Sequence, residues 1–134
     1  PINVGRDKLQ QVESIFKIVR APQLPSGTLD VNLDDAYIKV MVADDIHSPL
    51  CRIRNSPQGR AVAINSIFLP AVMEVLNELR GGGGEHEGKR WHRIFKAKCD
   101  YLGINLTSPD VWRDAQRILG DPFKKIVQTW EDAR

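Results

Sequence analysis

The clearest chemical pattern in the sequence is a basic segment in which positive side chains alternate with apolar ones. It runs from residue 88 to residue 99, contains no Asp or Glu, and carries Lys89, Arg90, Arg93, Lys96 and Lys98. At about 100° per residue on a helix, Lys89, Arg93 and Lys96 gather on one side. Trp91 and Phe95 fall on the other side. Such a helix suits nucleic-acid phosphates, an acidic partner or a membrane surface, and its alternative role is a core helix with a solvated basic face.

A second basic group precedes this segment and consists of Arg52, Arg54 and Arg60. The residues between them, Asn55 to Gly59, have the composition of a turn. If the chain brings this group onto the same face as the basic segment, the two sets form one surface for DNA or RNA. These eight residues are the predicted binding residues for nucleic acid or for a protein partner.

Metal-ligand spacing is absent from the sequence. The histidines show no His-x-x-x-His pattern and the two cysteines, Cys51 and Cys99, show no Cys-x-x-Cys pattern. Both cysteines fall in apolar surroundings, which predicts buried thiols in a reducing compartment. The sequence therefore predicts no catalytic residue, no metal and no cofactor.

Acidic residues flank one predicted strand and leave a catalytic alternative open. Asp34 and Asp35 precede the strand, and Asp44 and Asp45 follow it, with His47 nearby. Such a rim of carboxylates could hold Mg²⁺. Glu87 adds a Glu-x-Lys tripeptide with Lys89, a form found in some nucleases. A small metal-dependent nuclease or hydrolase that uses Asp34, Asp35, His47 or Glu87 is therefore the third functional hypothesis.

Four consecutive glycines, Gly81–Gly84, form the clearest break in the chain. A phosphate-binding loop follows a strand and leads into Lys and Ser or Thr, whereas a predicted helix precedes this run and Glu85 follows it. We therefore interpret the glycines as a connector. They separate a sub-part over residues 1–80, whose charges balance, from a helical sub-part over residues 85–134.

The elements that position these residues predict an α+β fold. Helical spacing predicts an N-terminal helix from Asp7 to Arg20. Alternating and β-branched segments then predict a small antiparallel meander of three or four strands. A long helix from about Ser66 to Arg80 follows, with an apolar face formed by Phe68, Val72, Val75, Leu76 and Leu79. The strands are expected at Thr28–Leu33, Ala36–Ala43, Leu50–Arg54 and Arg60–Ile64.

Three helices are predicted after the glycines, packed as a C-terminal bundle. They cover Gly88–Tyr101, Pro109–Leu119 and a last helix that opens at Asp121 and Pro122. Ser108 and Asp121 are the expected N-caps. Each helix carries one tryptophan on its apolar face, so Trp91, Trp112 and Trp130 are expected in the core.

Length and composition favour one domain over residues 1–134. The chain has 134 residues, is 42% hydrophobic and 27% charged, and has a formal net charge of +2. A charge so near zero does not demand a polyanionic partner. No membrane span or signal peptide is recognised, so a cytoplasmic location and no membrane partner are expected. The leading hypothesis is a non-catalytic interaction module, a subunit or domain of a larger intracellular assembly with a protein partner; a nucleic-acid-binding domain is the alternative.

Overall fold

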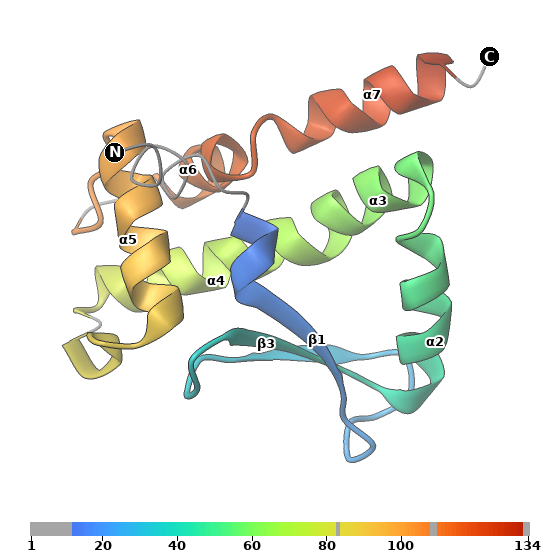
Figure 1. The fold of residues 1–134 in the computed structure, drawn as a ribbon, viewed down its shortest axis with the longest axis horizontal. Coiled ribbons are helices and arrows are strands. Elements are labelled where there is room, and N and C mark those ends of the chain that lie inside the picture. The colour runs from blue at the N-terminus through green and yellow to red at the C-terminus, as the bar shows by residue number, and fades with distance from the viewer. Residues whose placement is uncertain (1–11, 83, 108–109, 133–134) are drawn as a thin grey trace, which may run out of the picture.

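A computed structural model of the chain describes residues 12–82, 84–107 and 110–132. A three-stranded sheet forms one layer, a long helix crosses it, and two further helices lie above that helix (Figure 1). In order, the elements are η1 Val12–Ile15, β1 Phe16–Arg20, β2 Leu29–Asn32, β3 Ile38–Val42, α2 Asp44–Ile53, α3 Pro57–Ala63, η2 Ile64–Phe68, α4 Leu69–Arg80, η3 Gly84–His86, α5 Arg90–Leu102, α6 Val111–Ile118 and α7 Pro122–Asp132. The predicted α+β class is confirmed.

The sheet has the order β1-β3-β2, with β3 in the centre. β2 and β3 pair antiparallel, as predicted for the strands at Thr28–Leu33 and Ala36–Ala43. β1 runs parallel to β3, with Phe16 opposite Ile38, so the expectation of a purely antiparallel meander is wrong. Ile38, Val40 and Val42 of β3 are fully buried, because this strand lies under the long helix.

The N-terminal helix predicted over Asp7–Arg20 is wrong in its second half. Val12–Ile15 form a short 3-10 turn and Phe16–Arg20 form β1. The first half, which begins at Asp7, lies outside the described residues. The correction has a physical reason: residues 18 and 19 are β-branched, and the open edge of β3 satisfies the backbone of this segment.

Two segments predicted as strands are helices. Leu50–Ile53 is the last part of α2 and Arg54 is its C-cap; Ile46, Leu50 and Ile53 follow helical spacing, although Cys51–Arg54 alone alternates. Arg60–Ile64 belongs to α3 and the start of η2. The preceding Ser56 and Pro57 start a helix rather than a turn, because the Ser56 hydroxyl oxygen accepts a hydrogen bond from the Gly59 N–H at 3.0 Å.

The long helix is continuous from Pro57 to Arg80 and contains a π-helical stretch, η2. Pro70 explains this stretch, because its ring would meet the carbonyl of Ser66 in a regular α-helix. The buried residues of α4 include Val72, Val75 and Leu76, as predicted. By length and composition this helix is apolar enough to cross a membrane, yet 61% of its 18-residue apolar stretch is buried inside the fold, as in a core helix.

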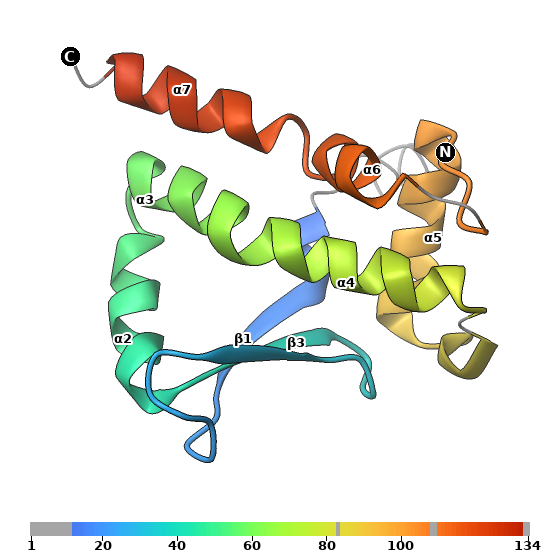
Figure 2. The same cartoon turned by 180° about the vertical axis from the view of Figure 1, so that it is seen from behind.

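The predicted C-terminal bundle is wrong, although the three helices exist. α7 packs on α3, α6 packs on α4, and α5 contacts η1 and α6. Figure 2 shows α7 following α3 while α5 crosses the opposite end of α4. The expected cap Ser108 and Pro109 lie outside the described residues, and Asp110 caps α6 through the Arg113 N–H. The apolar faces thus join one core around the long helix instead of forming a separate bundle.

One cluster of buried side chains takes members from both sides of the glycines, from Ile15 to Leu119. Trp91 and Phe95 are fully buried in it, as predicted, whereas Trp112 and Trp130 are exposed. Of the two cysteines only Cys99 is buried, and burial raises the pKa of its thiol to about 12. Cys51 is exposed on α2, so its predicted burial is wrong. The glycine run ends α4 as predicted, with Gly81 as the C-cap.

Candidate functional site

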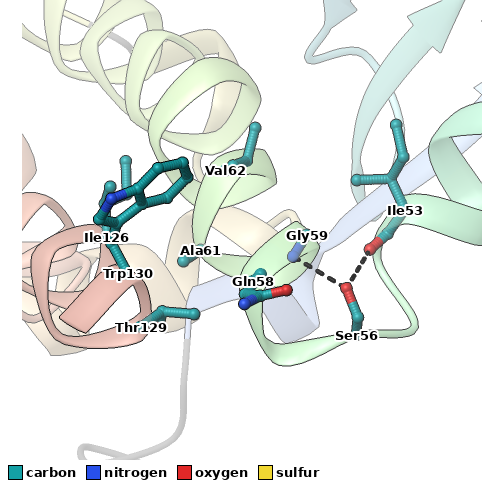
Figure 3. A pocket seen from close by; sticks show the side chains of 9 residues that line it. All are labelled: Ile53, Ser56, Gln58, Gly59, Ala61, Val62, Ile126, Thr129 and Trp130. Carbon is teal, nitrogen blue, oxygen red and sulfur yellow. Dashed lines mark hydrogen bonds between the residues drawn. The ribbon is translucent and has the colours of Figure 1, made fainter. Parts of the chain in front are cut away.

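An open, largely apolar groove of about 570 Å³ lies between the start of α3 and the end of α7. Its walls are formed by Ile53, Ser56, Gln58, Gly59, Ala61, Val62, Ile126, Thr129 and Trp130. In Figure 3 the indole of Trp130 reaches from α7 toward α3, and the Val62 side chain points outward from α3. Ile53, Val62 and Trp130 are 48%, 51% and 72% exposed. Large apolar side chains are therefore presented to solvent around a hollow.

Close packing of α2 against α3 fixes one wall of this groove. A Cβ atom at Gly59 would lie 1.7 Å from the carbonyl oxygen of Ile53, so only glycine fits there. The Ser56 hydroxyl also donates a hydrogen bond to that carbonyl at 3.4 Å (Figure 3). The sequence Ser-Pro-Gln-Gly thus makes a sharp corner that sets Ile53 beside the first turn of α3.

The opposite wall depends on how α7 leaves α6. Gly120 and Asp121 both have positive φ, at 72° and 56°, which turns the chain sharply before Pro122. The Asn65 amide then donates to the Pro122 carbonyl at 2.7 Å and to the Ala61 carbonyl at 2.9 Å. One side chain therefore ties the start of α7 to α3. The remainder of α7 runs along α3 (Figure 2).

The five predicted binding residues near α5 do not form a free cationic stripe. The Lys89 ammonium donates to the Leu33 carbonyl at 3.1 Å and to His86 Nδ1 at 3.0 Å, inside the fold. Lys96 pairs with Asp100 at 3.5 Å. Arg90 lies over the Tyr37 ring at 5.5 Å. Arg93 is exposed, and Lys98 is half-buried. Lys89 therefore has a structural role.

The three earlier arginines lie at the other end of the molecule. Arg52 and Arg54 are in and just after α2, and Arg60 is on α3, whereas α5 lies at the opposite end of the long axis (Figure 1). The two basic groups thus do not meet on one face. Arg52 and Arg54 instead directly precede and follow Ile53, a residue that lines the groove. Arg54 also stacks over Phe68 at 5.4 Å.

The acidic residues of the catalytic hypothesis are not brought together. Asp34 and Asp35 precede β3, while Asp44 and Asp45 follow it, and a five-residue strand spans about 16 Å. Three of these four carboxylates have local partners. Asp35 pairs with Lys39 at 2.5 Å, Asp44 with Arg20 at 3.8 Å, and Asp45 accepts hydrogen bonds from the Ser26 hydroxyl and the Gly27 N–H.

The remaining candidates of that hypothesis also lie apart. Glu87 lies in the loop between α4 and α5, and is exposed. His47 lies on α2, and its Nδ1 is buried with no hydrogen-bond partner among the described residues. α2 and that loop occupy opposite ends of the fold (Figure 1). The structure therefore does not assemble Asp34, Asp35, His47 and Glu87 into one centre.

A polar cluster that the sequence analysis missed lies where the glycine run ends. His86 is buried, and its Nε2 lies 3.3 Å from a Glu78 oxygen and 3.5 Å from a Glu85 oxygen. These three side chains could hold a metal ion by distance alone. An ammonium can only donate, so Nδ1 accepts from Lys89 and the proton sits on Nε2, pointing at Glu78. The protonated Nε2 does not fit a metal ligand.

The same cluster anchors the chain after the glycines to the loop between β2 and β3. The Trp91 indole N–H donates to the Leu33 carbonyl at 3.1 Å, and its ring lies 5.3 Å from that of His86. The Trp91 backbone N–H donates to the Ala36 carbonyl at 3.0 Å. The chain after the glycines is thus held by buried polar contacts. The signal in the sequence was a histidine and a lysine at (i, i+3) beside a buried tryptophan.

Searches against family models, curated protein sequences and solved structures find no match to this chain. The candidate site therefore stands on the geometry of its own residues.

Proposed function

We propose that the protein is a non-catalytic interaction module that binds an apolar segment of a protein partner in the groove between α3 and α7. The supporting observation is the exposure of Ile53, Val62 and Trp130 around one hollow. Single exposed apolar side chains are ordinary, whereas several around one concave surface are typical of binding sites. Tryptophan is also enriched among the residues that dominate binding energy at protein interfaces.

The charges on the α2–α3 side of the groove favour an acidic partner. No Asp or Glu occurs from residue 46 to residue 73, whereas Arg52, Arg54 and Arg60 fall in this stretch. An amphipathic helix that places apolar residues at i, i+3 and i+7 fits such a groove. Acidic residues beside that row would face the arginines and speed association. The proposed partner is therefore an amphipathic helix with an acidic flank.

Nuclear magnetic resonance of the labelled 134-residue chain tests this proposal. A designed helical peptide with a Leu row and Glu flanks is titrated against a control in which every flanking Glu is Lys. The acidic peptide should shift the amide signals of α3 and the end of α7, and it should bind about tenfold or more tightly than the basic one.

Two matched variants sharpen the peptide experiment. Val62→Glu places a carboxylate in the groove and should weaken binding at least tenfold. Leu29→Glu changes an apolar side chain that is 42% exposed on β2, away from the groove, and should leave the affinity unchanged. Equal binding of both peptides, or binding that survives Val62→Glu, would contradict the proposed site.

We keep nucleic-acid binding by α5 as the alternative proposal. Arg90, Arg93 and Lys96 are exposed on α5, and residues 88–99 contain no acid. A mobility-shift assay with DNA and RNA at low and moderate salt tests it. Binding that falls steeply with salt and is lost in an Arg90→Gln, Arg93→Gln variant would support this alternative, and no binding at low salt would end it.

A further inference from the structure

α7 carries a second row of apolar side chains, of which only Trp130 also lines the groove. Phe123, Val127 and Trp130 occur at i, i+4 and i+7, and the first two are 66% and 46% exposed. Ile126 and Thr129 line the groove toward α3 instead. At about 100° per residue, the outer row lies roughly 100° around the helix from this inner face. α7 thus has more apolar surface than α3 covers.

Opposite charges flank this outer row on one side. Lys124 and Glu131 are seven residues apart, so they lie almost directly above one another on the helix. Both are displaced by roughly 80° from the row in the same direction. The positive charge is therefore near the start of the row and the negative charge near its end.

We infer that α7 pairs antiparallel with α7 of a second copy of this chain. A twofold axis near Val127 would place Phe123 of each copy against Trp130 of the other. The same symmetry brings Lys124 of one copy beside Glu131 of the other, twice per dimer. A parallel arrangement would instead place the charged flanks of the two copies on opposite sides of the interface, so that Lys124 of one copy would not meet Glu131 of the other. The apolar row and the charges thus favour one geometry.

The length of α7 limits the strength of this pairing. An eleven-residue helix is about 16 Å long. Two such helices bury less than the roughly 800 Å² per partner of a stable interface, so the dimer is a weak one. We expect a dissociation constant in the range of about 10 μM to 1 mM, as for transient assemblies. The interface uses a different face of α7 from the groove, with Trp130 at their shared border.

Sedimentation velocity of the 134-residue chain from about 10 μM to 2 mM tests the inference. The mean mass should rise with concentration from monomer toward dimer. Val127→Glu should shift the dissociation constant upward by more than tenfold. Val62→Glu changes the groove and should leave self-association unchanged. A chain that stays monomeric to 2 mM overturns the dimer and leaves the groove proposal to its own peptide experiment.

A charge swap identifies the antiparallel geometry. Lys124→Glu and Glu131→Lys each create two like-charge pairs per homodimer, so each variant alone should dimerise about tenfold more weakly. An equimolar mixture of the two variants restores both opposite-charge pairs and should recover the wild-type constant. Circular dichroism confirms that the variants fold. A mixture that remains as weak as its parts overturns the antiparallel arrangement.

Discussion

The two ends of the molecule differ in which side chains they bury. Where the glycine run meets α5, the polar groups of His86 and Lys89 are drawn inside and matched to partners at 3.0 to 3.3 Å. Where α3 meets α7, the apolar side chains of Val62 and Trp130 are left in solvent. At the first end, polar groups are buried with their hydrogen bonds formed. At the second end, apolar side chains are exposed around the groove.

This difference separates residues that hold the fold from residues that are free to bind. Polar groups that are buried with their hydrogen bonds satisfied stabilise one conformation, and removing a partner is costly. Exposed apolar groups contribute little to folding, because water still covers them in the folded state. The comparison therefore predicts that substitutions at the two ends differ in their effects on stability.

The largest expected difference in stability between the two ends concerns Trp91 and Trp130. Trp91→Ala leaves a large cavity and removes the hydrogen bond to Leu33, so it should lower the free energy of unfolding by about 3–5 kcal/mol. Trp130→Ala should change it by less than about 0.5 kcal/mol. Urea denaturation followed by circular dichroism measures both. Similar losses in the two variants would abolish the distinction between the ends.

Gly59 shows that the groove end is nonetheless tightly packed below its surface. Gly59→Ala sets a methyl group against the Ile53 carbonyl, which should cost about 1–3 kcal/mol, more than the roughly 1 kcal/mol that alanine adds as a better helix former. Gly84→Ala is the control, because its Cβ would meet no atom within 4 Å. A stability of Gly59→Ala equal to that of Gly84→Ala, measured in urea, would show that the corner relaxes freely.

The Lys89 contacts measure how much the buried polar end contributes. Lys89→Met leaves His86 Nδ1 buried without its donor, so the free energy of unfolding should fall by about 1–2 kcal/mol. Lys96→Met removes an exposed pair with Asp100 and should cost less than about 0.5 kcal/mol. Urea denaturation of both variants tests whether the Lys89 contacts stabilise the fold. A larger loss for Lys96→Met would return Lys89 to the set of binding residues.

The sequence was most informative where the determinants are local. The β2–β3 hairpin and the buried face of α4 were predicted correctly, because alternation and helical spacing can be recognised within about ten residues. β1 was missed, because its strand conformation depends on pairing with β3, more than twenty residues away. α2 was missed, because Cys51–Arg54 alternates by chance although Ile46 and Leu50 follow a helical period.

The candidate site was less predictable than the fold, since it depends on tertiary contact. Val62 and Trp130 are 68 positions apart and meet only because α7 folds back on α3. One local signal was present: Phe123, Ile126, Val127 and Trp130 form an apolar arc wider than one neighbouring helix can cover. The basic residues could be identified from the sequence. Their separation onto opposite ends of the molecule could not be predicted from it.

The smallest predicted effect concerns a solvent-exposed cluster of polar groups at the start of α2. The Asp45 carboxylate accepts hydrogen bonds from the Ser26 hydroxyl at 2.6 Å and from the Gly27 N–H at 3.1 Å. These contacts, the Ser26 bond first, lower the pKa of Asp45 below its usual 3.8. The folded protein therefore binds fewer protons here than the unfolded chain. Their contribution to stability is complete above pH 3.8 and is lost as the pH falls through the lowered pKa.

Ser26→Ala removes the larger of these contacts and should lower the melting temperature slightly at pH 5 to 7. Below pH 3.8 the difference from the wild type should shrink, because the wild-type carboxylate is then being protonated as well. Ser66→Ala is the control, since its hydroxyl donates to the Val62 carbonyl and involves no titrating group, so its difference should not change with pH. Calorimetry across this range measures both. A difference for Ser26→Ala that widened in acid would reverse the sign of the linkage and remove Asp45 as its source.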